Sequence, residues 1–343
     1  MRRIIKNWWN GLRYEPGDPR YHTGRDIKVA VIGGGTGLAN LLRGLKRYSR
    51  HISAIVTVAD SGSSTGELRR EFDIPAPGDI RKCLAALALD EVLVTKLFDY
   101  RFAQKKSRLG GHTLGNIWLT ALSDYFGSFD KAIEVTSEIF QTAGKVLPAT
   151  LEPVDLIIEY EDGTKVKGED YLDKLVKRPR KISLSKKGVR AYTKAIRALG
   201  EADLIVIGPG SLYGSVIPNF LIPGITQAVR QNRRAVKTYV ANCSTERTQT
   251  AKYSIDDHIQ AIFEHAGGRV FDHCLVNNKI LRRSKDVYKL GEVNNITTDK
   301  QEILGVRIAC DDIISTPNPL YHNSEKLAES LIELYNKQET EGL

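Results

Sequence analysis

Cysteine is scarce in this chain, and its cysteines are far apart in the sequence. Cys83, Cys243, Cys274 and Cys310 are the four among 343 residues, and their spacing matches neither a zinc site nor a redox pair. Scattered thiols in a chain of this length are typical of a reducing compartment, where they pack as small apolar residues. We therefore expect a cytoplasmic protein that is not held together by disulfides.

Long apolar runs are also missing. No stretch approaches the roughly 18 apolar residues that a membrane helix needs, and the start MRRIIKNWW has only short apolar pairs after its charges. Neither a transmembrane segment nor a signal peptide is therefore expected. With 41% hydrophobic and 27% charged residues, the composition is that of a globular protein and excludes a disordered chain or a collagen-like fibre.

Basic residues outnumber acidic ones. The chain has 50 Lys and Arg against 41 Asp and Glu, a net charge of +9. This excess favours an anionic ligand such as a phosphate, a nucleotide or a nucleic acid, without choosing among them. Residues 170–190 are rich in Lys and Arg, but no aromatic stacking pattern accompanies them. We expect a solvated loop there and no nucleic-acid partner.

Residues 1–25 form a separate basic-aromatic extension. They hold six Arg or Lys and two acids, with Trp8 and Trp9 among them. Such a segment either lies on an anionic membrane surface or a partner, or packs its tryptophans on the body of the protein. We favour the second interpretation.

Alternating strand and helix patterns begin after this extension. The apolar run 27–32 is followed by glycines at 33–37, a helical pattern over 38–48 and a second apolar run at 52–59. This order is a βαβ unit, which predicts a parallel sheet. We expect an α/β fold: a Rossmann-like, mostly parallel sheet flanked by helices, in a single domain over 26–338.

The rest of the chain repeats this alternation around a smaller inserted region. Residues 156–167 read as a β-hairpin with a turn at 161–163, inside an insertion over about 151–190. The remaining expected elements are helices over 79–141 (interrupted near 105–112 and 127), 219–231, 258–266 and 324–337, and strands at 203–207, 235–241 and 272–276.

Four polar, glycine-rich loops follow predicted strands. They are residues 33–37, 60–66, 208–211 and 242–250. Ligands of open parallel sheets bind beyond the carboxyl ends of the strands. We therefore expect these loops to meet at one edge of the sheet and to form a ligand site.

The first loop has the composition of a phosphate-binding turn. Gly33 to Gly37 allow a tight turn and close backbone approach, and the following helix presents free N–H groups to an anion. The loop is not the full dinucleotide fingerprint, because the third glycine would fall at Leu38. A glycine-rich turn that serves packing alone is the alternative.

Charged and polar residues near the second strand extend this site. Asp60 could bind ribose hydroxyls or a cation, and Ser61 and Ser63 could donate to phosphate or sugar oxygens; a flexible polar turn is the alternative. A cation in a first helical turn is unfavourable on dipole grounds, so Arg81 indicates an anionic partner. His112 is either a polar contact or general acid, or a structural residue.

The loop at 208–211 is a second phosphate-type loop. A lipase-like nucleophile elbow would need glycine at positions 209 and 213, which hold Pro209 and Tyr213. A Ser-His-Asp hydrolase is therefore disfavoured.

Several long motifs in one order resemble the YvcK/CofD-like family over about residues 27–335. The resemblance rests on GGGTGLANLLRGLK (33–46), VTVADSGSSTGELRREFDIPAPGDIRKCL (56–84), GGHTLGN (110–116), GKVLPAT (144–150) and IGPGSLYGSVIPNFLIPGI (207–225). The style of the DIPAPGDIRK and IGPGSLYGSVIPN segments is that of the gluconeogenesis-factor, or morphogenesis, branch.

This resemblance implies a Rossmann-like fold and a cytoplasmic bacterial protein that supports cell shape and growth on gluconeogenic carbon. It implies binding of a nucleotide sugar of the UDP-N-acetylglucosamine class. In the alternative, a transferase similar to 2-phospho-L-lactate transferase uses a nucleotide-diphospho donor and Mg²⁺, with Asp60 as the candidate catalytic residue and candidate Mg²⁺ ligand. We also expect a homo-oligomer.

The resemblance and the loop chemistry together give one set of ligand-binding candidates. They are Gly34, Gly35, Thr36, Gly37, Asp60, Ser61, Ser63, Gly78, Asp79, Arg81, His112, Asn116, Gly208, Pro209, Gly210, Ser211, Tyr213, Asn242 and Thr245.

Two departures from the family pattern concern this set. The family commonly has two adjacent acids where this chain has Asp60 and Ser61. One carboxylate fewer weakens the hypothesis of a Mg²⁺-dependent reaction. The loop that usually reads Asn-x-x-Thr-Gln-x-Gly-Glu-Thr is here NCSTERTQT (242–250). Asn242 and Thr245 are kept, but the glycine and one acid are not.

Overall fold

The computed structural model describes residues 27–103, 107–280, 295–316, 318 and 320–341. The expected N-terminal extension lies outside these residues. In the described part, no helix combines the length and the apolar character needed to cross a membrane.

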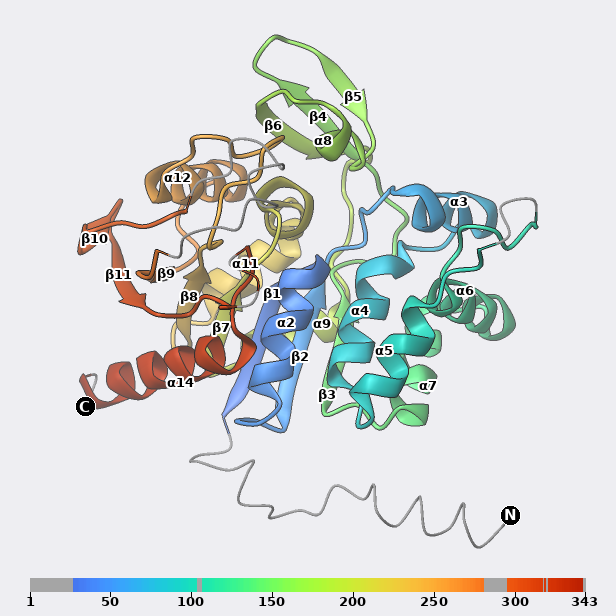
Figure 1. Cartoon of the computed structure of the whole chain (residues 1–343), viewed down its shortest axis with the longest axis horizontal. Helices are drawn as coiled ribbons and strands as arrows, with labels where there is room; N and C mark the ends of the chain where they lie inside the picture. The colour runs from blue at the N-terminus through green and yellow to red at the C-terminus, as the bar shows by residue number, and fades with distance from the viewer. Residues whose placement is uncertain (1–26, 104–106, 281–294, 317, 319, 342–343) are drawn as a thin grey trace, which may run out of the picture.

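An eight-stranded sheet is the centre of the fold (Figure 1). Its strands, in spatial order, are β10 (Glu302–Ile303), β11 (Val306–Asp311), β9 (His273–Asn277), β8 (Val236–Val240), β7 (Leu204–Ile207), β1 (Lys28–Gly33), β2 (His51–Val56) and β3 (Gly144–Pro148). All neighbours in this sheet pair in parallel except β10 with β11. The α/β, mostly parallel fold class is therefore confirmed.

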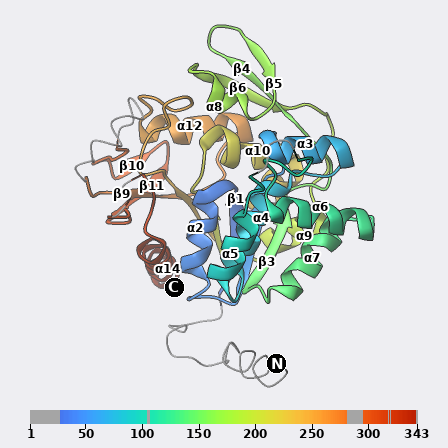
Figure 2. The same ribbon diagram turned by 45° about the vertical axis from the view of Figure 1, so that its right-hand side comes forward.

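Helices cover both faces of the sheet, so its central strands are apolar on both sides. All four residues of β7 are buried, as are five of the six in β1. Figures 1 and 2 show α2, α4 and α14 on one face and α9 and α11 on the other. The longer helices are α2 (Gly35–Leu45), α3 (Ser63–Phe72), α4 (Pro77–Leu87), α5 (Glu91–Asp99), α6 (Leu114–Phe126), α7 (Phe129–Ile139), α9 (Thr193–Glu201), α11 (Pro223–Gln231), α12 (Ile255–Ala266) and α14 (Ser324–Glu341).

The chain reverses its direction across the sheet between β1 and β7. It runs from β1 outward through β2 to β3, then returns to pair β7 with β1 and continues outward through β8 and β9. The long helices that follow β1 and β7, α2 and α11, therefore lie on opposite faces of the sheet (Figure 1). A crevice between them is where open α/β sheets bind their ligands.

A small antiparallel sheet projects from the main body, at the top of Figure 1. It contains the expected hairpin, β4 (Leu156–Tyr160) and β5 (Lys165–Lys167), and also β6 (Pro179–Leu184) on the other side of β4. A short helix, α8 (Tyr171–Lys174), joins β5 to β6. The expectation of a solvated loop over 170–190 is therefore wrong. Ile182 is 1% exposed, and burial of its apolar side chain stabilises the packing of β6.

Several element boundaries also differ from the prediction. The first helix begins at Gly35, three residues early, because the glycines themselves form its first turn. The long helical stretch has a further break before α5, where Asp90 caps the new helix by accepting from Leu93 N at 3.0 Å. The helix predicted over 219–231 is split into α10 (Ile217–Phe220) and α11, since the residue before a proline disfavours helical geometry.

Candidate functional site

The glycine loops after β1 and β7 lie against each other. A Cβ atom built on Gly37 would meet Pro209 O at 2.8 Å, and one built on Gly210 would meet Gly34 O at 3.2 Å. Side chains at these positions would push the two loops apart. The glycines expected to approach a ligand thus also allow the two loops to approach each other.

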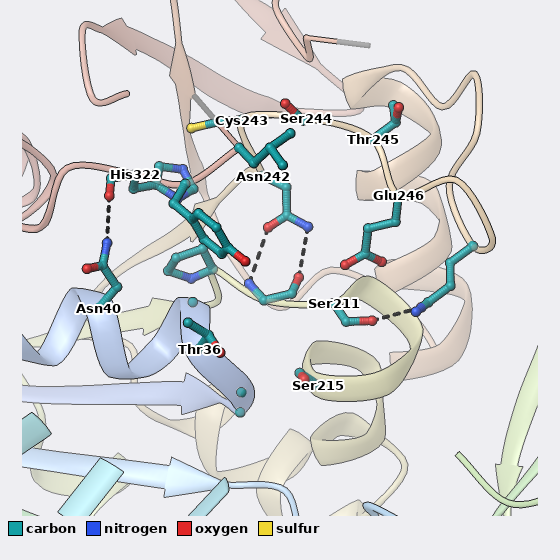
Figure 3. A pocket seen from close by; sticks show the side chains of 18 of the residues that line it. Thr36, Asn40, Ser211, Ser215, Asn242, Cys243, Ser244, Thr245, Glu246 and His322 are labelled. Carbon is teal, nitrogen blue, oxygen red and sulfur yellow. Dashed lines mark hydrogen bonds between the residues drawn. The ribbon is translucent and has the colours of Figure 1, made fainter. Parts of the chain in front are cut away.

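A cavity of about 480 Å³ opens over these two loops (Figure 3). Its size is within the usual range for small-molecule sites. The wall combines residues that follow β1, β7 and β8 with others from α4, the small sheet and the segment before α14. They are Gly34, Gly35, Thr36, Gly37, Asn40, Lys82, Glu169, Asp173, Pro209, Gly210, Ser211, Ser215, Asn242, Cys243, Ser244, Thr245, Glu246, Gln249, Leu320, Tyr321 and His322.

The N-terminus of α2 supplies the anion-binding chemistry of this cavity. Gly34 is its N-cap in an extended conformation and provides no side-chain cap. Gly35 has a φ of 68°, in the left-handed region that favours glycine. The backbone N–H groups and the positive end of the helix dipole therefore face the cavity, which suits a phosphate.

Asn242 fixes the second loop. Its Nδ2 donates to Gly210 O at 2.9 Å, and its Oδ1 accepts from Gly210 N at 3.2 Å. Figure 3 shows the two bonds side by side. Ser211 donates to Gln249 Oε1 at 2.8 Å and accepts from Gly214 N at 3.2 Å. The loop after β7 is thus held in place by residues that follow β8.

A buried group of charges lies between this cavity and the end of β2. Lys82 Nζ donates to Asp79 Oδ1 at 3.1 Å, and Asp60 accepts from Gly62 N at 2.7 Å. Burial and the neighbouring Asp79 raise the pKa of Asp60. The carboxylate of Asp79 raises the pKa of Lys82, so Lys82 is a fixed cation in the wall of the cavity.

Gly78 leaves room for the carboxyl group of Asp60 beside the helix that carries Asp79. A Cβ atom at this position would lie 2.7 Å from Asp60 Oδ2 and 2.7 Å from Thr65 Oγ1. Glycine therefore lets the side chain of Asp60 pack directly on the first turn of α4. Asp79 lines the second cavity described below, whereas Gly78 lines neither cavity, and ligand binding by these two residues stays a prediction.

A second cavity of about 840 Å³ adjoins the first and contains the loop after β2. Asp60, Ser61 and Gly62 line it from the main sheet, and residues 167–171 line it from the small sheet. Glu169 belongs to both cavities. Its burial, together with the charges of Asp60 and Asp79, raises the pKa of Glu169 to about 9.

Four of the predicted ligand-binding residues form side-chain contacts with residues that line neither cavity. Arg81 is buried and pairs with Asp99, and it donates to Phe98 O at 3.0 Å. It therefore joins α4 to α5. A cation in this first turn is explained by the carboxylate of Asp99 without any anionic ligand.

The other three also lie in packed contacts. His112 Nδ1 lies 3.1 Å from Ser64 Oγ, and Asn116 donates to the same oxygen at 3.1 Å. Tyr213 shares a 2.9 Å hydrogen bond with the hydroxyl of Tyr253. These bonds fasten α3 to α6 and the segment after Ser211 to the start of α12. Ser63 begins α3, and its side chain is outside the described part.

Several cavity residues were missed from the sequence. Lys82, the sequence neighbour of Arg81, is not among the predicted ligand-binding residues. Glu169 and Asp173 belong to the region interpreted as a solvated loop. Tyr321 and His322 follow a stretch for which no element was predicted, and a lone Tyr-His pair carries no recognisable signal. Asn40 Nδ2 donates to His322 O at 2.6 Å and thereby connects α2 to this stretch.

The Mg²⁺ implied by the transferase resemblance can be tested against these residues. Within the described ranges, no group of three or more His, Cys, Asp or Glu side chains is arranged to hold a metal ion. Mg²⁺ often binds through one or two carboxylates and the phosphates of a substrate. Asp60 and Asp79 fit that second mode, in which the ion would be held jointly with a phosphorylated ligand.

Comparisons with known proteins agree with the motifs. The family model described as "2-phospho-L-lactate transferase CofD" matches residues 29–314. The chain is 41% identical over 309 residues to a "Gluconeogenesis factor" of Halalkalibacterium halodurans, covering 89% of this chain and 95% of the relative. It is 40% identical over 315 residues to the "Gluconeogenesis factor" of Bacillus subtilis, covering 91% and 99%.

A solved structure is similar over the same region. The crystal structure of a UPF0052 family protein from Bacillus halodurans matches with a TM-score of 0.84 and 40% identity, and the match covers 90% of this chain and all of that one. The family resemblance inferred from the motifs is therefore confirmed.

Proposed function

Because the chain belongs to the CofD family and has gluconeogenesis factors among its relatives, we propose that it is a nucleotide-sugar-binding regulatory protein of that group. Its ligand is of the UDP-N-acetylglucosamine class. It acts in the cytoplasm and supports cell shape and growth on gluconeogenic carbon sources. Its assembly as a homo-oligomer is a separate prediction, which analytical ultracentrifugation tests.

The observation that carries this proposal is the contact between the two glycine loops at the point where strand order reverses. The diphosphate lies over Gly34–Gly37 and Gly208–Ser211, where the N–H groups that open α2 compensate its charge. Lys82 adds a half-buried cation on the side of α4. The volume of the cavity, about 480 Å³, suits a ligand of nucleotide size.

Isothermal titration calorimetry on the full chain tests the proposal. Saturable binding of UDP-N-acetylglucosamine and UDP is expected, with weaker binding of uridine, which has no phosphate. Absence of heat with every uridine nucleotide, with and without Mg²⁺, would contradict it.

A transferase remains the second candidate, and the pair Asp60 and Asp79 favours it. The buried carboxylate of Asp79 and the half-buried one of Asp60, beside a phosphate site, could stabilise a transferred group electrostatically, jointly with Mg²⁺. This function predicts product formation from a nucleotide-diphospho donor, abolished in Asp60→Asn. Turnover that survives this substitution would remove Asp60 from the reaction.

A further inference from the structure

Glu246 is the residue of the first cavity whose chemistry the phosphate site does not use. It lies after β8, on the opposite side of the glycine loops from His322 and Asn40 (Figure 3). Its Oε2 atom is buried and accepts no hydrogen bond from the described residues. A buried carboxylate oxygen without a partner is costly, so its presence in a cavity wall points to a ligand donor.

The protein supplies little to satisfy this carboxylate. The hydroxyl of Ser211 is close enough to lower the pKa of Glu246 in part, but its single hydrogen is directed to Gln249 Oε1 at 2.8 Å. The nearest charged influence on Glu246 is Asp173, a second acid. Burial and the charge of Asp173 raise the pKa of Glu246 to about 7.

The backbone holds Glu246 in place independently of a ligand. Its N–H donates to Thr250 Oγ1 at 2.8 Å, and its carbonyl oxygen accepts from Thr250 N at 2.9 Å. Thr250 is itself fully buried. The carboxylate is therefore presented from a fixed turn, as a recognition group needs to be.

In dinucleotide folds, an acid after the second strand accepts hydrogen bonds from ribose hydroxyls. The corresponding acid here is Asp60. It is engaged by Gly62 N at 2.7 Å and lines the second cavity instead of the first. The hydroxyl-binding position in the first cavity is thus left to another acid.

We propose that Glu246 accepts hydrogen bonds from a vicinal pair of hydroxyl groups on the bound nucleotide sugar, and so determines which sugar the site accepts. The two oxygens of a carboxylate match two neighbouring hydroxyls. The pair belongs either to the ribose or to the attached sugar. This inference rests on the proposed function, since it requires that the cavity binds such a ligand.

Calorimetry with two pairs of ligands tests the inference. UDP is compared with 2′-deoxy-UDP, and UDP-N-acetylglucosamine with its 3-deoxy analogue, because C2 of this sugar carries an acetamido group and its vicinal hydroxyls are at C3 and C4. The wild-type chain should bind the hydroxylated member of one pair about 10- to 100-fold more tightly, as expected for hydrogen bonds to a charged acceptor. A preference within the first pair identifies the ribose, and within the second pair the attached sugar.

Glu246→Gln should reduce that preference to less than about threefold, because a neutral amide replaces the charged acceptor. Glu71→Gln is the matched control, since Glu71 is an exposed residue of α3, and it should keep the wild-type preference. If the Gln variant does not fold, Glu246→Asp is used in the same comparison. It keeps the negative charge but shortens the side chain by one methylene group, so it should also reduce the preference.

The outcomes separate the two proposals. Binding of UDP and UDP-N-acetylglucosamine by the wild type, with equal preferences in wild type and both Glu246 variants, would overturn the role of Glu246 alone. A wild type without preference in either pair would do the same. A wild type that binds neither UDP nor UDP-N-acetylglucosamine would overturn the proposed function together with this inference.

Discussion

Asn242 forms a two-point hydrogen-bonded pair with the backbone of Gly210, at 2.9 and 3.2 Å. The N–H and the carbonyl oxygen of Gly210 are therefore both paired with one side chain, which comes from the loop after the neighbouring strand. This pair connects β8 to the loop after β7 without any ligand. Asn242 can therefore affect ligand binding through the position of the loop after β7, without contacting the ligand itself.

The substitution Asn242→Ala is expected to weaken ligand binding through loop position. Loss of both bonds leaves the donor and acceptor of Gly210 unpaired and should lower the free energy of unfolding by about 1–3 kcal/mol. Affinity for UDP should fall because the loop after β7 is no longer fixed. Urea denaturation and calorimetry measure the two effects. A variant that loses stability but binds UDP as the wild type does would show that the pair is purely structural.

Gly37→Ala tests the contact between the two glycine loops. The new Cβ would meet Pro209 O at 2.8 Å and Pro209 C at 3.0 Å, and backbone atoms cannot move aside cheaply. The loops should separate, with a loss of UDP affinity of at least about tenfold, or 1.4 kcal/mol. Calorimetry gives the affinity, and circular dichroism confirms that the fold is kept.

Gly200→Ala is the matched control for that experiment. Gly200 lies in α9, and a Cβ atom there meets nothing within 4 Å. Alanine in a helix is favoured over glycine, so this variant should gain about 0.5–1 kcal/mol of stability. Its UDP affinity should equal that of the wild type. Equal losses of affinity in both variants would mean that the effect at Gly37 is not specific to the loop contact.

Lys82→Met is expected to weaken phosphate binding. The ammonium group of the half-buried Lys82 pairs with Asp79 and lines the cavity, so its removal leaves the charges of Asp60 and Asp79 uncompensated near a diphosphate. We expect a loss of UDP affinity of about 10- to 100-fold, as for a hydrogen bond to a charged group. Lys145→Met, at an exposed position of β3, should not alter the affinity measured by calorimetry.

Arg81→Met should separate a structural residue from a ligand residue. Arg81 joins α4 to α5 through Phe98 O and Asp99, so its loss should lower the free energy of unfolding by about 1–3 kcal/mol. UDP affinity should stay within about twofold of the wild type under conditions where the variant is folded. A large loss of affinity in a folded variant would restore Arg81 to the ligand site.

The sequence was informative where function requires unusual residues in local order. The glycines at 33–37 and 208–211 identify two strand ends, because glycine runs are needed where backbone approaches backbone or ligand. The alternation of apolar strands and amphipathic helices identified the parallel sheet, because strands covered by helices on both faces are apolar throughout. Both signals lie within short segments and need no knowledge of distant contacts.

The rest of the site depends on contacts between distant segments. Glu169 reaches the cavity because the segment after β5 is bound to the loop after β2, where Ser61 Oγ donates to Asp170 Oδ1 at 2.8 Å. No local pattern in the sequence encodes this contact. Arg81 was placed in the site because a cation in a first helical turn suggested an anion, and Asp99 is that anion. Tyr321 is brought to the cavity by the bond between Asn40 and His322, across 282 residues of sequence.

The final prediction concerns the pH dependence of stability and the carboxyl group of Glu169. Burial and the charges of Asp60 and Asp79 raise its pKa in the folded protein to about 9, from an ordinary value of 4.5. The folded state therefore holds a proton that the unfolded state loses above about pH 4.5. The contribution of Glu169 to the free energy of unfolding is therefore greatest below pH 4.5, and it is lost progressively as the pH rises toward 9.

Glu169→Gln removes this titration while it keeps the shape of the side chain. The melting temperature of the variant should exceed that of the wild type at pH 8.5, by about 2–4 °C for each 1 kcal/mol gained, and the difference should shrink at pH 5.5. Differential scanning fluorimetry across this range measures it. Glu71→Gln is the control for an exposed glutamate. A difference between Glu169→Gln and wild type that stays constant from pH 5.5 to 8.5 would show that Glu169 does not take up a proton on folding.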